Sequence, residues 1–420
     1  MSATLIFRHR NPGRYAFNVL AGAVEEFEGE AGFELVVART HDELVRRTRS
    51  AVEAGRTTVA AWSFYSPSFA ECAEEMRELR AAVPHGWTSL AGGVHATAEP
   101  VAVLHGGFER VAIGEGEHVV RAIVAAMLAG ASFDSVRGLA RLENGELASS
   151  GRAEPVSNLD EFPAFAPRRR LFGAIEITRG CIYACKFCQT PFLAKARFRH
   201  RSTKNVAHWA GEIARAGLRD VRFISPTALS YGSADESVNL AAVEELLARV
   251  RESVGRHGRI FFGTFPSEVR PEHVTEAALD VLRRFVDNDN LVIGGQSGSE
   301  RVLAGSHRGH DVPSIERAVR VASECGFRPN VDFLLGLPGE DESDLRATLE
   351  LVERLTELGA KAHAHTFMPL PGTPFRAASA GAVSGEARTR IESLEGSGRL
   401  FGQWRRQESI ARELAQRRDG

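Results

Sequence analysis

Cys181, Cys185 and Cys188 are the residues whose types and spacing most directly indicate chemistry in this chain. Gaps of four and then three residues, just after an apolar segment, let one short loop curl around an iron–sulfur cubane and point three thiolates inward. A cubane of four irons that receives only three thiolates keeps one iron open for another ligand. The spacing therefore predicts an iron–sulfur site with an open iron.

A zinc site or a structural role are the alternatives for these three cysteines. Zinc usually takes four Cys or His ligands, and His200 is the local candidate for the fourth. Buried or disulfide-bonded cysteines rarely gather in a loop that also holds Gly, Lys and Tyr, so a structural role is the weaker alternative. The other two of the five cysteines, Cys72 and Cys325, lie in helical patterns and are predicted to be core residues.

Six apolar segments, each followed by a helical pattern, surround and follow the cysteine loop. They are residues 174–178, 220–225, 260–263, 291–295, 330–335 and 362–368, and the clearest helices are residues 205–216, 236–254 and 341–358. This alternation predicts a partial (β/α)6 barrel of the TIM type over residues 171–376. The cysteine loop then leaves the first strand at its carboxyl end, where barrel enzymes place their active sites. Residues 377–420 are predicted to form a helical C-terminal extension.

The first part of the chain also alternates strands and helices. Five strands, residues 3–8, 33–38, 57–64, 88–91 and 110–113, predict a doubly wound, Rossmann-like α/β domain over residues 1–130. The first strand lacks a following G-x-G-x-x-G loop, which disfavours nicotinamide and flavin dinucleotides. Small residues at three neighbouring strand ends favour a broad, flat ligand, although glycines there can also serve only tight turns. A hairpin with an Asn-Gly turn and a proline-containing linker are predicted over residues 131–170.

The cysteine loop resembles that of the radical S-adenosylmethionine (SAM) superfamily. The superfamily signature C-x-x-x-C-x-aromatic-C is matched by Cys181, Cys185, Phe187 and Cys188. The resemblance implies a 4Fe-4S cluster on the three cysteines, whose open iron is chelated by the amino and carboxylate groups of SAM. Electron transfer from the cluster then cleaves SAM and gives a 5'-deoxyadenosyl radical.

Residues 294–303, 332–340 and 367–374 resemble the fourth-, fifth- and sixth-strand segments of radical SAM barrels. The SAM-binding residues implied by the resemblance are Phe187, Ser225, Thr227, Gln296, Ser297, Arg308 and Met368. Many relatives carry acidic residues after the second strand to hold the SAM amino group, whereas this chain has Ser-Pro-Thr at residues 225–227. The hydroxyl or backbone oxygens of that segment are expected to replace them.

The N-terminal domain resembles the cobalamin-binding (B12-binding) domain that precedes the barrel in one branch of the superfamily. The recurrent Gly-Gly-x-His-Ala-Thr and Gly-Glu-Gly-Glu motifs lie at residues 92–97 and 114–117. The cobalamin-binding residues implied are Asn11, Ser63, Tyr65, Ser66, Gly92, Gly93, His95, Gly114, Glu115 and Gly116. His9 does not complete the Asp-x-His-x-x-Gly motif, so cobalt is expected to lack a protein histidine ligand, and His95 is expected to order its own loop.

Together the two resemblances imply a cobalamin-dependent radical SAM methyltransferase that acts on an unactivated carbon of a small metabolite. A cobalamin-dependent cyclase or rearrangement enzyme and a non-catalytic cobalamin and iron–sulfur sensor stay open as alternatives. A methylthiotransferase needs three more cysteines in its N-terminal domain, which here has only Cys72. No catalytic residue is assigned, because Tyr183, Tyr231, His363 and His365 are of types that commonly serve as half-buried hydrogen-bonding residues.

Composition limits the partners. The chain has 420 residues, 43% of them hydrophobic, and a formal net charge of −2, which indicates neither general nucleic-acid binding nor attraction to an anionic membrane. A signal peptide and a membrane-spanning segment are not apparent. We expect a cytoplasmic, monomeric enzyme with a small-molecule substrate and an external reductant such as flavodoxin or ferredoxin.

Overall fold

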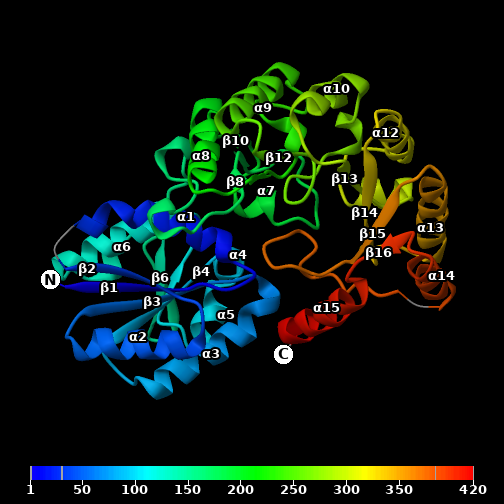
Figure 1. The fold of residues 1–420 in the computed structure, drawn as a ribbon. Coiled ribbons are helices and arrows are strands. Elements are labelled where there is room, and N and C mark those ends of the chain that lie inside the picture. The colour runs from blue at the N-terminus through cyan, green and yellow to red at the C-terminus, as the bar shows by residue number, and fades with distance from the viewer. Residues whose placement is uncertain (1, 30–31, 384, 420) are drawn as a thin grey trace. The chain divides into compact units, whose positions relative to one another are not determined.

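The computed structural model describes residues 2–29, 32–383 and 385–419. The chain divides into two compact units, with the boundary between Gly173 and Ala174 (Figure 1). Each unit has its own sheet and helices. Among the helices that the structure describes, none combines the length and the apolar character of a membrane span.

Unit 1 is built on a seven-stranded sheet with the order β2-β1-β3-β4-β5-β6-β7. The strands are β1 (Ala3–Arg8), β2 (Phe33–Ala38), β3 (Thr57–Ser63), β4 (Trp87–Gly92), β5 (Arg110–Ala112), β6 (Leu139–Glu143) and β7 (Glu146–Ser149). The first five strands are parallel, and β6 and β7 are antiparallel additions. The five predicted strands are therefore present, and their order is doubly wound.

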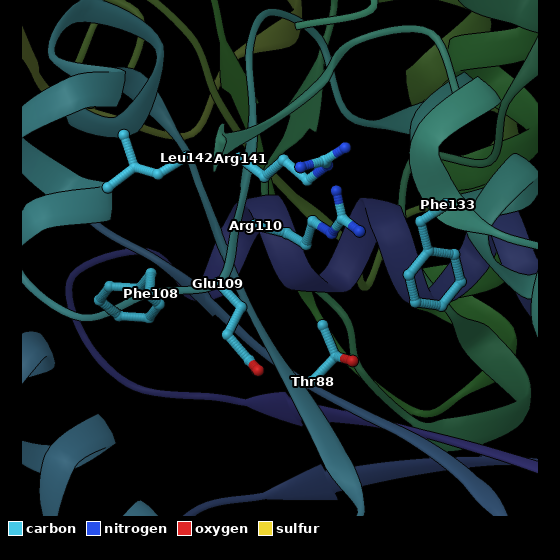
Figure 2. A pocket seen from close by; sticks show the side chains of 7 residues that line it. All are labelled: Thr88, Phe108, Glu109, Arg110, Phe133, Arg141 and Leu142. Carbon is cyan, nitrogen blue, oxygen red and sulfur yellow. The ribbon is translucent and has the colours of Figure 1, made fainter. Parts of the chain in front are cut away.

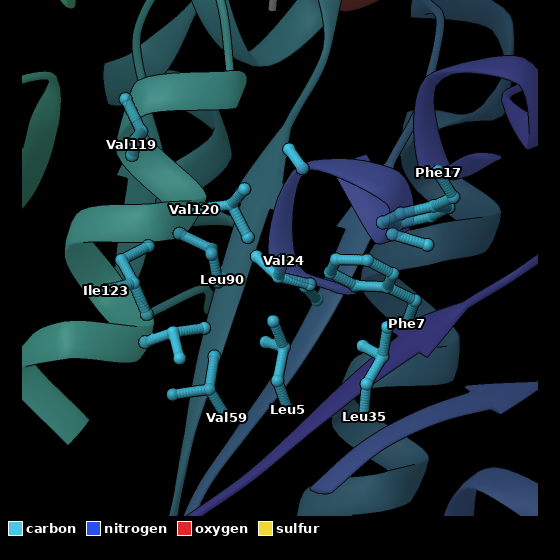
Figure 3. Packing of buried hydrophobic residues seen from close by; sticks show 14 of the residues in the cluster. Leu5, Phe7, Phe17, Val24, Leu35, Val59, Leu90, Val119, Val120 and Ile123 are labelled. Atoms are coloured by element: carbon cyan, nitrogen blue, oxygen red, sulfur yellow. The ribbon is translucent and has the colours of Figure 1, made fainter. Parts of the chain in front are cut away.

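Helices cover both faces of this sheet because alternate residues of the central strands are apolar on both sides. The helices are α1 (Arg14–Val24), α2 (His41–Glu53), α3 (Phe69–Ala82), α4 (Val94–Ala98), α5 (Pro100–His105) and α6 (Glu117–Ala129). Leu5 and Phe7 of β1 pack with α1 and α6, as Figure 3 shows. Ile6, between them, packs on the other face with α2 and α3. The two apolar layers fix the sheet and hold the carboxyl ends of its strands together.

The hairpin and linker segment, residues 131–170, belongs to unit 1 rather than standing apart from it. Strand β6 pairs antiparallel with β5, and the hairpin turn places Asn144 at φ 54° and Gly145 at φ 83°. The proline-containing stretch contributes Val156, Leu159 and Phe162 to the core under α1 and α6. The proline-containing stretch has no regular helix or strand period, but its apolar side chains pack into the core of unit 1.

Unit 2 contains the parallel strands of the predicted partial barrel. Three-stranded and four-stranded sheets have the orders β12-β11-β8 and β13-β14-β15-β16, and a parallel bridge between Val269 and Ile293 joins them. The strands are β8 (Ile175–Glu176), β11 (Asp220–Ile224), β12 (Arg259–Phe261), β13 (Asn290–Gln296), β14 (Arg328–Leu335), β15 (Lys361–Thr366) and β16 (Leu400–Phe401). A separate antiparallel pair, β9 (Thr178–Arg179) and β10 (Arg199–His200), flanks the cysteine loop.

The helices of unit 2 follow the strands as predicted, with bounds set by their caps. They are α7 (Thr190–Leu193), α8 (Thr203–Arg215), α9 (Leu240–Val254), α10 (Glu276–Phe285), α11 (Glu300–Gly305), α12 (Val312–Glu324), α13 (Glu342–Glu357), α14 (Gly385–Gly396) and α15 (Trp404–Asp419). Helix α9 begins at Leu240, not at residue 236, because the Asn239 side chain accepts from the Ala242 N–H and caps the helix there.

The C-terminal extension is not purely helical. Between α14 and α15, Leu400 and Phe401 add a seventh parallel strand beside β15, with Leu400 paired to Ala362. Leu400 is buried with Ile391 and Leu394 of α14 nearby in sequence. A strand of two residues has no detectable period, which is why the sequence did not reveal it.

Candidate functional site

The cysteine loop follows β9, just beyond the carboxyl end of the first barrel strand. All three cysteines are free; Cys185 is buried, and Cys181 and Cys188 are half-buried. They are close enough for each thiolate to disfavour the others, and burial raises the pKa of Cys181 to about 11. Cys181 and Cys188 are therefore thiols in the metal-free loop, and a bound metal would displace their protons.

Backbone contacts hold the cysteine loop in its conformation. Gly180 has φ 81°, and a Cβ at this position would collide with the Arg197 carbonyl oxygen. The Cys181 N–H donates to the Lys195 carbonyl at 3.3 Å, and the Lys186 N–H donates to the Ser306 carbonyl at 3.0 Å. The loop is thus fastened on both sides of Cys185, and only glycine fits its entry.

Arg308 links the cysteine loop to the fourth barrel strand. Its Nη2 donates to the Gly294 carbonyl at 2.7 Å, and its Nη1 lies 3.7 Å from Cys185 Sγ. The buried Nε has no partner within the described residues. A fixed guanidinium beside a cysteine sulfur stabilises negative charge there, and its spare N–H can receive a carboxylate. This position fits the predicted role of Arg308 toward the SAM carboxylate.

His200 cannot complete a zinc site in this arrangement. Its Nδ1 lies 3.0 Å from the Thr178 hydroxyl, and its Nε2 lies 2.8 Å from the Ser233 carbonyl. Both ring nitrogens are therefore used by the protein. The zinc alternative loses its one local candidate for a fourth ligand, and a site with three thiolates and an open position is favoured.

The predicted SAM-binding residues separate into those that are available and those already engaged. Ser297 is fully buried, and its hydroxyl lies 3.2 Å from the Thr348 hydroxyl and accepts from the Ser299 N–H. Gln296 has φ 75°, and its Nε2 lies close to Gly294. Gln296 is therefore placed beside Arg308, whereas the Ser297 side chain holds the segment against α13.

The segment after β11 has the oxygen atoms predicted for it, in a buried setting. The Ser225 hydroxyl donates to the Thr227 carbonyl at 2.8 Å, and the buried Thr227 Oγ1 has no partner among the described residues. Buried hydroxyls rarely stay unpaired. Thr227 Oγ1 is therefore the atom of this segment that is available to a ligand, and Ser225 shapes the turn.

Phe187 and Met368 lie at the edges of this region. Phe187 packs partly buried against an apolar cluster of Val302, Leu337 and Phe367. Met368 is half-buried, directly after β15 and Phe367. Both provide apolar surface beside the cysteine loop and the sixth strand.

Glu268 is a residue near this site that the sequence did not single out. It follows the third strand, β12, and interacts electrostatically with Arg308, with Asp332 on the fifth strand and with His363 on the sixth. Burial and then Asp332 raise its pKa to about 7. A single glutamate in a loop carries no motif, so no signal in the sequence could have found it.

Two tyrosines considered as substrate contacts have structural roles. The Tyr183 hydroxyl lies 3.0 Å from His273 Nε2, and the ring stacks on the Arg270 guanidinium at 3.5 Å. The Tyr231 hydroxyl donates to the Arg201 carbonyl at 2.7 Å. His363 and His365, in contrast, are half-buried on β15 beside Asp332.

In unit 1, the loops at the carboxyl ends of β1, β3, β4 and β5 come together. The Phe64 N–H donates to the Gly92 carbonyl, and the Gly114 N–H donates to Thr97 Oγ1. A Cβ on Gly13 would lie 2.7 Å from the Ser63 carbonyl oxygen. The predicted cobalamin-binding loops thus form one continuous strand-end surface.

Several predicted cobalamin-binding residues also have roles within this surface. Gly93 has φ 91° and is crowded by Ser63 and Phe64, and Gly114 has φ 107°. His95 Nδ1 lies 3.0 Å from the Ser66 hydroxyl, so His95 orders its own loop as expected. These contacts show that tight turns alone already require some of the small residues.

The remaining residues of this set differ in availability. Tyr65 is 46% exposed, and Asn11 is exposed. A Cβ on Gly92 would meet no atom closer than 3.9 Å, whereas Gly116 is packed against Leu20. The Glu115 carboxylate accepts from the Val156 N–H at 2.9 Å, which gives it a partner within unit 1. Tyr65, Asn11 and Gly92 are the positions most open to a ligand.

His9 is engaged within unit 1. Its Nε2 lies 2.9 Å from Asn18 Oδ1. This contact engages one ring nitrogen of His9, and the expectation that cobalt lacks a histidine ligand continues to rest on the absence of the Asp-x-His-x-x-Gly motif.

A pocket of about 320 Å³ lies at the opposite edge of the same sheet (Figure 2). Its lining residues are Thr88, Phe108, Glu109, Arg110, Phe133, Arg141 and Leu142. Arg110 and Arg141 both pair with Asp134, and Arg80 pairs with Glu109. These charges neutralise one another at the amino ends of β4 and β5, away from the strand ends where doubly wound folds bind ligands.

Cys72 and Cys325 differ from each other. Cys72 is 1% exposed in the core of unit 1, as predicted, but Cys325 is only half-buried. It occupies the C-cap of α12, where the helix ends beside Gly326. The helical period therefore predicted the buried face of α12 correctly, but it wrongly included Cys325, which lies at the end of the helix.

A partial parallel barrel with three free cysteines after its first strand, preceded by a doubly wound domain, defines a two-domain iron–sulfur enzyme of the barrel type. Residues 175–352 match the family model of the radical SAM superfamily. The match lies within unit 2 and includes the cysteine loop. The predicted two-domain α/β fold is confirmed by solved structures that share it.

Two such structures match nearly the whole chain. TsrM from Kitasatospora setae, a radical SAM methyltransferase with cobalamin and a 4Fe-4S cluster bound, aligns with a TM-score of 0.70 and 18% identity over 90% of this chain and 74% of that chain. The cobalamin-dependent SAM radical enzyme OxsB with aqua-cobalamin aligns with a TM-score of 0.67 and 16% identity over 84% of this chain and 52% of that chain. At this identity the likeness establishes the fold.

Curated relatives by sequence are of another type. The tRNA-2-methylthio-N(6)-dimethylallyladenosine synthase of Pelobacter propionicus is 27% identical over 56% of this chain and 52% of its own length. A synthase of the same name from a Shewanella species is 30% identical over 48% of this chain and 41% of its own length. The chain spans about half or less of the length of these relatives.

Proposed function

We propose that this chain is a cobalamin-dependent radical SAM methyltransferase that methylates a carbon of a small metabolite. The observation that carries the proposal is the presence on one chain of the cysteine loop after the first barrel strand and of a doubly wound unit with converging strand-end loops. The fold shared with TsrM over 90% of the chain supports it.

The residues of unit 2 fit a 4Fe-4S cluster and SAM. Three free cysteines would hold three irons, and Arg308, with an unpaired Nε beside Cys185, would receive the SAM carboxylate. Thr227 Oγ1, also unpaired, would face the SAM amino group. When bound, the pair supplies a 5'-deoxyadenosyl radical; the chain's own part is to keep the open iron accessible, orient SAM and exclude water.

The residues of unit 1 fit cobalamin as a broad ligand held by shape. Tyr65 and Asn11 are exposed at the strand ends, and the turns at Gly93 and Gly114 leave no side chain there. Bound cobalamin would supply a methyl group. Because the chain lacks the Asp-x-His-x-x-Gly motif after β1, cobalt would lack the axial histidine that this motif supplies.

A tRNA methylthiotransferase is the function that the curated sequence relatives suggest. We disfavour it because a second cluster in unit 1 would need three cysteines, and unit 1 contains only Cys72, which is 1% exposed. A cyclase or rearrangement enzyme is the second candidate, since OxsB, a cobalamin-dependent SAM radical enzyme, shares the fold.

The proposed partners are a small-molecule substrate and an external reductant such as flavodoxin or ferredoxin. A structure of TsrM with tryptophan and a SAM analogue supports a small molecule. The formal net charge of −2 gives no general attraction to tRNA. We propose that the enzyme acts as a monomer.

Anaerobic reconstitution tests the proposal. The protein purified with iron, sulfide and hydroxocobalamin should hold about four irons and one cobalamin, and with SAM and dithionite it should form 5'-deoxyadenosine and S-adenosylhomocysteine. Candidate metabolites are then screened for a mass gain of one methyl group. Failure to retain cobalamin, or 5'-deoxyadenosine without any S-adenosylhomocysteine, would contradict methyl transfer and favour the cyclase or rearrangement function.

A further inference from the structure

Asp332, His363 and His365 form a polar group on two adjacent strands of unit 2, which we call the acceptor cluster. Asp332 on β14 is the register partner of His363 on β15. His365 follows two residues later and therefore points to the same face of the sheet. The side chain of Asp332 is 8% exposed, and those of His363 and His365 are about 30% exposed.

The acceptor cluster lies on the face that carries the cysteine loop. Gly294, Asp332 and His363 stand in one row across β13, β14 and β15. The Gly294 carbonyl of that row accepts from Arg308, whose other guanidinium nitrogen contacts Cys185. This face is therefore the one toward which a SAM molecule on the open iron would lie.

The adjacent row has the opposite character. Ile293, Val331 and Ala362 are register partners and are between 0% and 3% exposed. Val331 packs close to Ile315 of α12 around Gly295. The alternation confirms that apolar side chains face the helices and that the acceptor cluster faces the barrel interior.

Three atoms of the acceptor cluster converge. Asp332 Oδ1 lies 2.9 Å from His363 Nδ1, and His365 Nε2 lies 3.1 Å from His363 Nδ1 and 4.0 Å from Asp332 Oδ1. Two imidazoles and a carboxylate at such distances could hold a metal ion. Whether they do depends on which nitrogen of His365 carries the proton.

Gln407 on α15 determines that proton. The Thr366 N–H donates to Gln407 Oε1 at 2.9 Å, so the amide nitrogen of Gln407 must be the atom that faces His365 Nδ1 at 3.0 Å. The amide nitrogen donates, hence His365 Nδ1 accepts and the proton lies on Nε2. Burial and then His363 lower the pKa of His365, which keeps the ring neutral. The protonated Nε2 donates to His363 Nδ1 at 3.1 Å, and it has no lone pair to offer a metal.

The polar atoms of the acceptor cluster that lack a donor are carboxylate oxygens. His363 Nδ1 accepts from His365 Nε2–H, so the proton of a neutral His363 lies on Nε2. Asp332 Oδ1, 2.9 Å from that accepting nitrogen, therefore receives no hydrogen bond from His363, and Asp332 Oδ2 has no hydrogen-bond partner within the described ranges. The carboxyl group of Glu268 lies near enough to interact with both Asp332 and His363. Two carboxyl groups therefore face the interior against one nearby guanidinium, that of Arg308.

We propose that the acceptor cluster binds a protonated amine, with Asp332 as the charged partner and the neighbouring Glu268 as a second acceptor. An ammonium group supplies several N–H donors and a positive charge, which matches this set of acceptors better than a metal ion or a neutral hydroxyl. The inference rests on the proposed function, in which two molecules bring such a group into the barrel: an amine-bearing substrate, and SAM itself.

Calorimetric titration of the reconstituted protein tests the proposal with benzylamine and benzyl alcohol, which differ in one polar group. We expect benzylamine to bind at least about tenfold more tightly, since a charge-assisted hydrogen bond contributes about 1.5 kcal/mol or more. Asp332→Asn keeps the shape of the side chain and should remove this preference. Glu268→Gln, a second variant, should reduce it, and Asp289→Asn, at an exposed ion pair, should leave it unchanged.

The source of the amine is separated by adding SAM. If benzylamine still binds in the presence of SAM, and Asp332→Asn leaves the dissociation constant of SAM unchanged, the amine belongs to the substrate. If SAM displaces benzylamine, and Asp332→Asn weakens SAM binding about tenfold, the amine is that of SAM. Both results support an ammonium site.

Equal binding of benzylamine and benzyl alcohol would overturn the proposal, as would the absence of binding by both. Tight binding of one Zn²⁺ that is lost in His365→Ala would overturn it in favour of a metal site. These readouts do not require turnover, so a negative result would leave 5'-deoxyadenosine formation, the test of the proposed function, unaffected.

Discussion

The cysteine loop of unit 2 and the strand-end loops of unit 1 use their residues in different ways. In the cysteine loop, the three thiols form no disulfide, and their backbone is held by contacts from residues 195–197 and 306. At the strand ends of unit 1, Ser66, His95 and Glu115 already have partners in the protein. A cofactor bound through metal–ligand bonds therefore leaves a distinct sequence pattern, whereas one bound by shape leaves mainly glycines and turns.

The largest expected effect is the loss of the cluster from unit 2. Cys185→Ala removes one of three thiolates, and we expect reconstituted iron to fall to background and 5'-deoxyadenosine formation to cease. Iron assay and product chromatography measure both. Cys72→Ala, in the core of unit 1, should keep full iron content. Equal iron loss in both variants would remove the distinction between the two regions.

Gly180→Ala tests whether the backbone of the cysteine loop is as necessary as its thiolates. The new Cβ meets the Arg197 carbonyl oxygen at φ 81°, so we expect a loss of about 3 kcal/mol in unfolding free energy and reduced iron. Gly217→Ala has the same strain at φ 80° but nothing within 4 Å, and it should cost only about 1 kcal/mol. Urea unfolding compares the two, and matching losses would show that strain alone matters.

Glu340→Gln tests a carboxylate of unit 2 that, unlike Glu115, keeps a buried oxygen without a partner in the described chain. Burial raises the pKa of Glu340 from 4.5 to about 7. A raised native pKa means that wild-type stability falls as pH rises from about 4.5 to about 7, because the folded state resists ionisation. Glutamine should therefore stabilise the protein by about 2 to 3 kcal/mol at pH 8 and by little at pH 4.5. A gain that did not change between the two pH values would contradict this assignment.

Gly93→Ala probes the shape of the strand-end surface in unit 1. Its Cβ would lie 2.9 Å from Ser63 Oγ and 3.0 Å from the Phe64 carbonyl oxygen. We expect cobalamin affinity to fall about tenfold, or about 1.4 kcal/mol, with unchanged iron content. Gly55→Ala, with φ 66° and open space, is the matched control. Cobalamin binding is followed by its visible absorbance after gel filtration, and a loss of iron instead would break the comparison.

Strong periodicity and strict spacing in the sequence were sufficient to predict most of the strands and helices of the fold. The strands at residues 3–8 and 33–38 have the predicted bounds, because both are short, mostly apolar segments rich in residues that favour strands. The start of α9 and the strand at Leu400 were not predicted. The cap at Asn239 is a contact with Ala242, which shifts a helix start without changing the apolar period, and the two-residue strand depends on pairing with Ala362, which is distant in sequence.

In the candidate site, too, some features could be predicted from the sequence and others could not. The spacing of Cys181, Cys185 and Cys188 alone indicated an iron–sulfur loop, since thiolates must be close to share one cubane. The sequence could not reveal that Glu268 approaches Asp332, or that Ser297 is turned toward Thr348. Those relations depend on strand register and helix packing.

The sequence by itself determined two α/β units and a three-thiolate loop, because each follows from local period and spacing. Only the tertiary structure decided which polar groups are already satisfied and which are left for a ligand. His200 is bonded at both nitrogens, and Gln407 fixes the proton on His365. A hydrogen bond requires specific atoms at specific distances. Residues that are far apart in the sequence reach those distances only when the barrel is assembled.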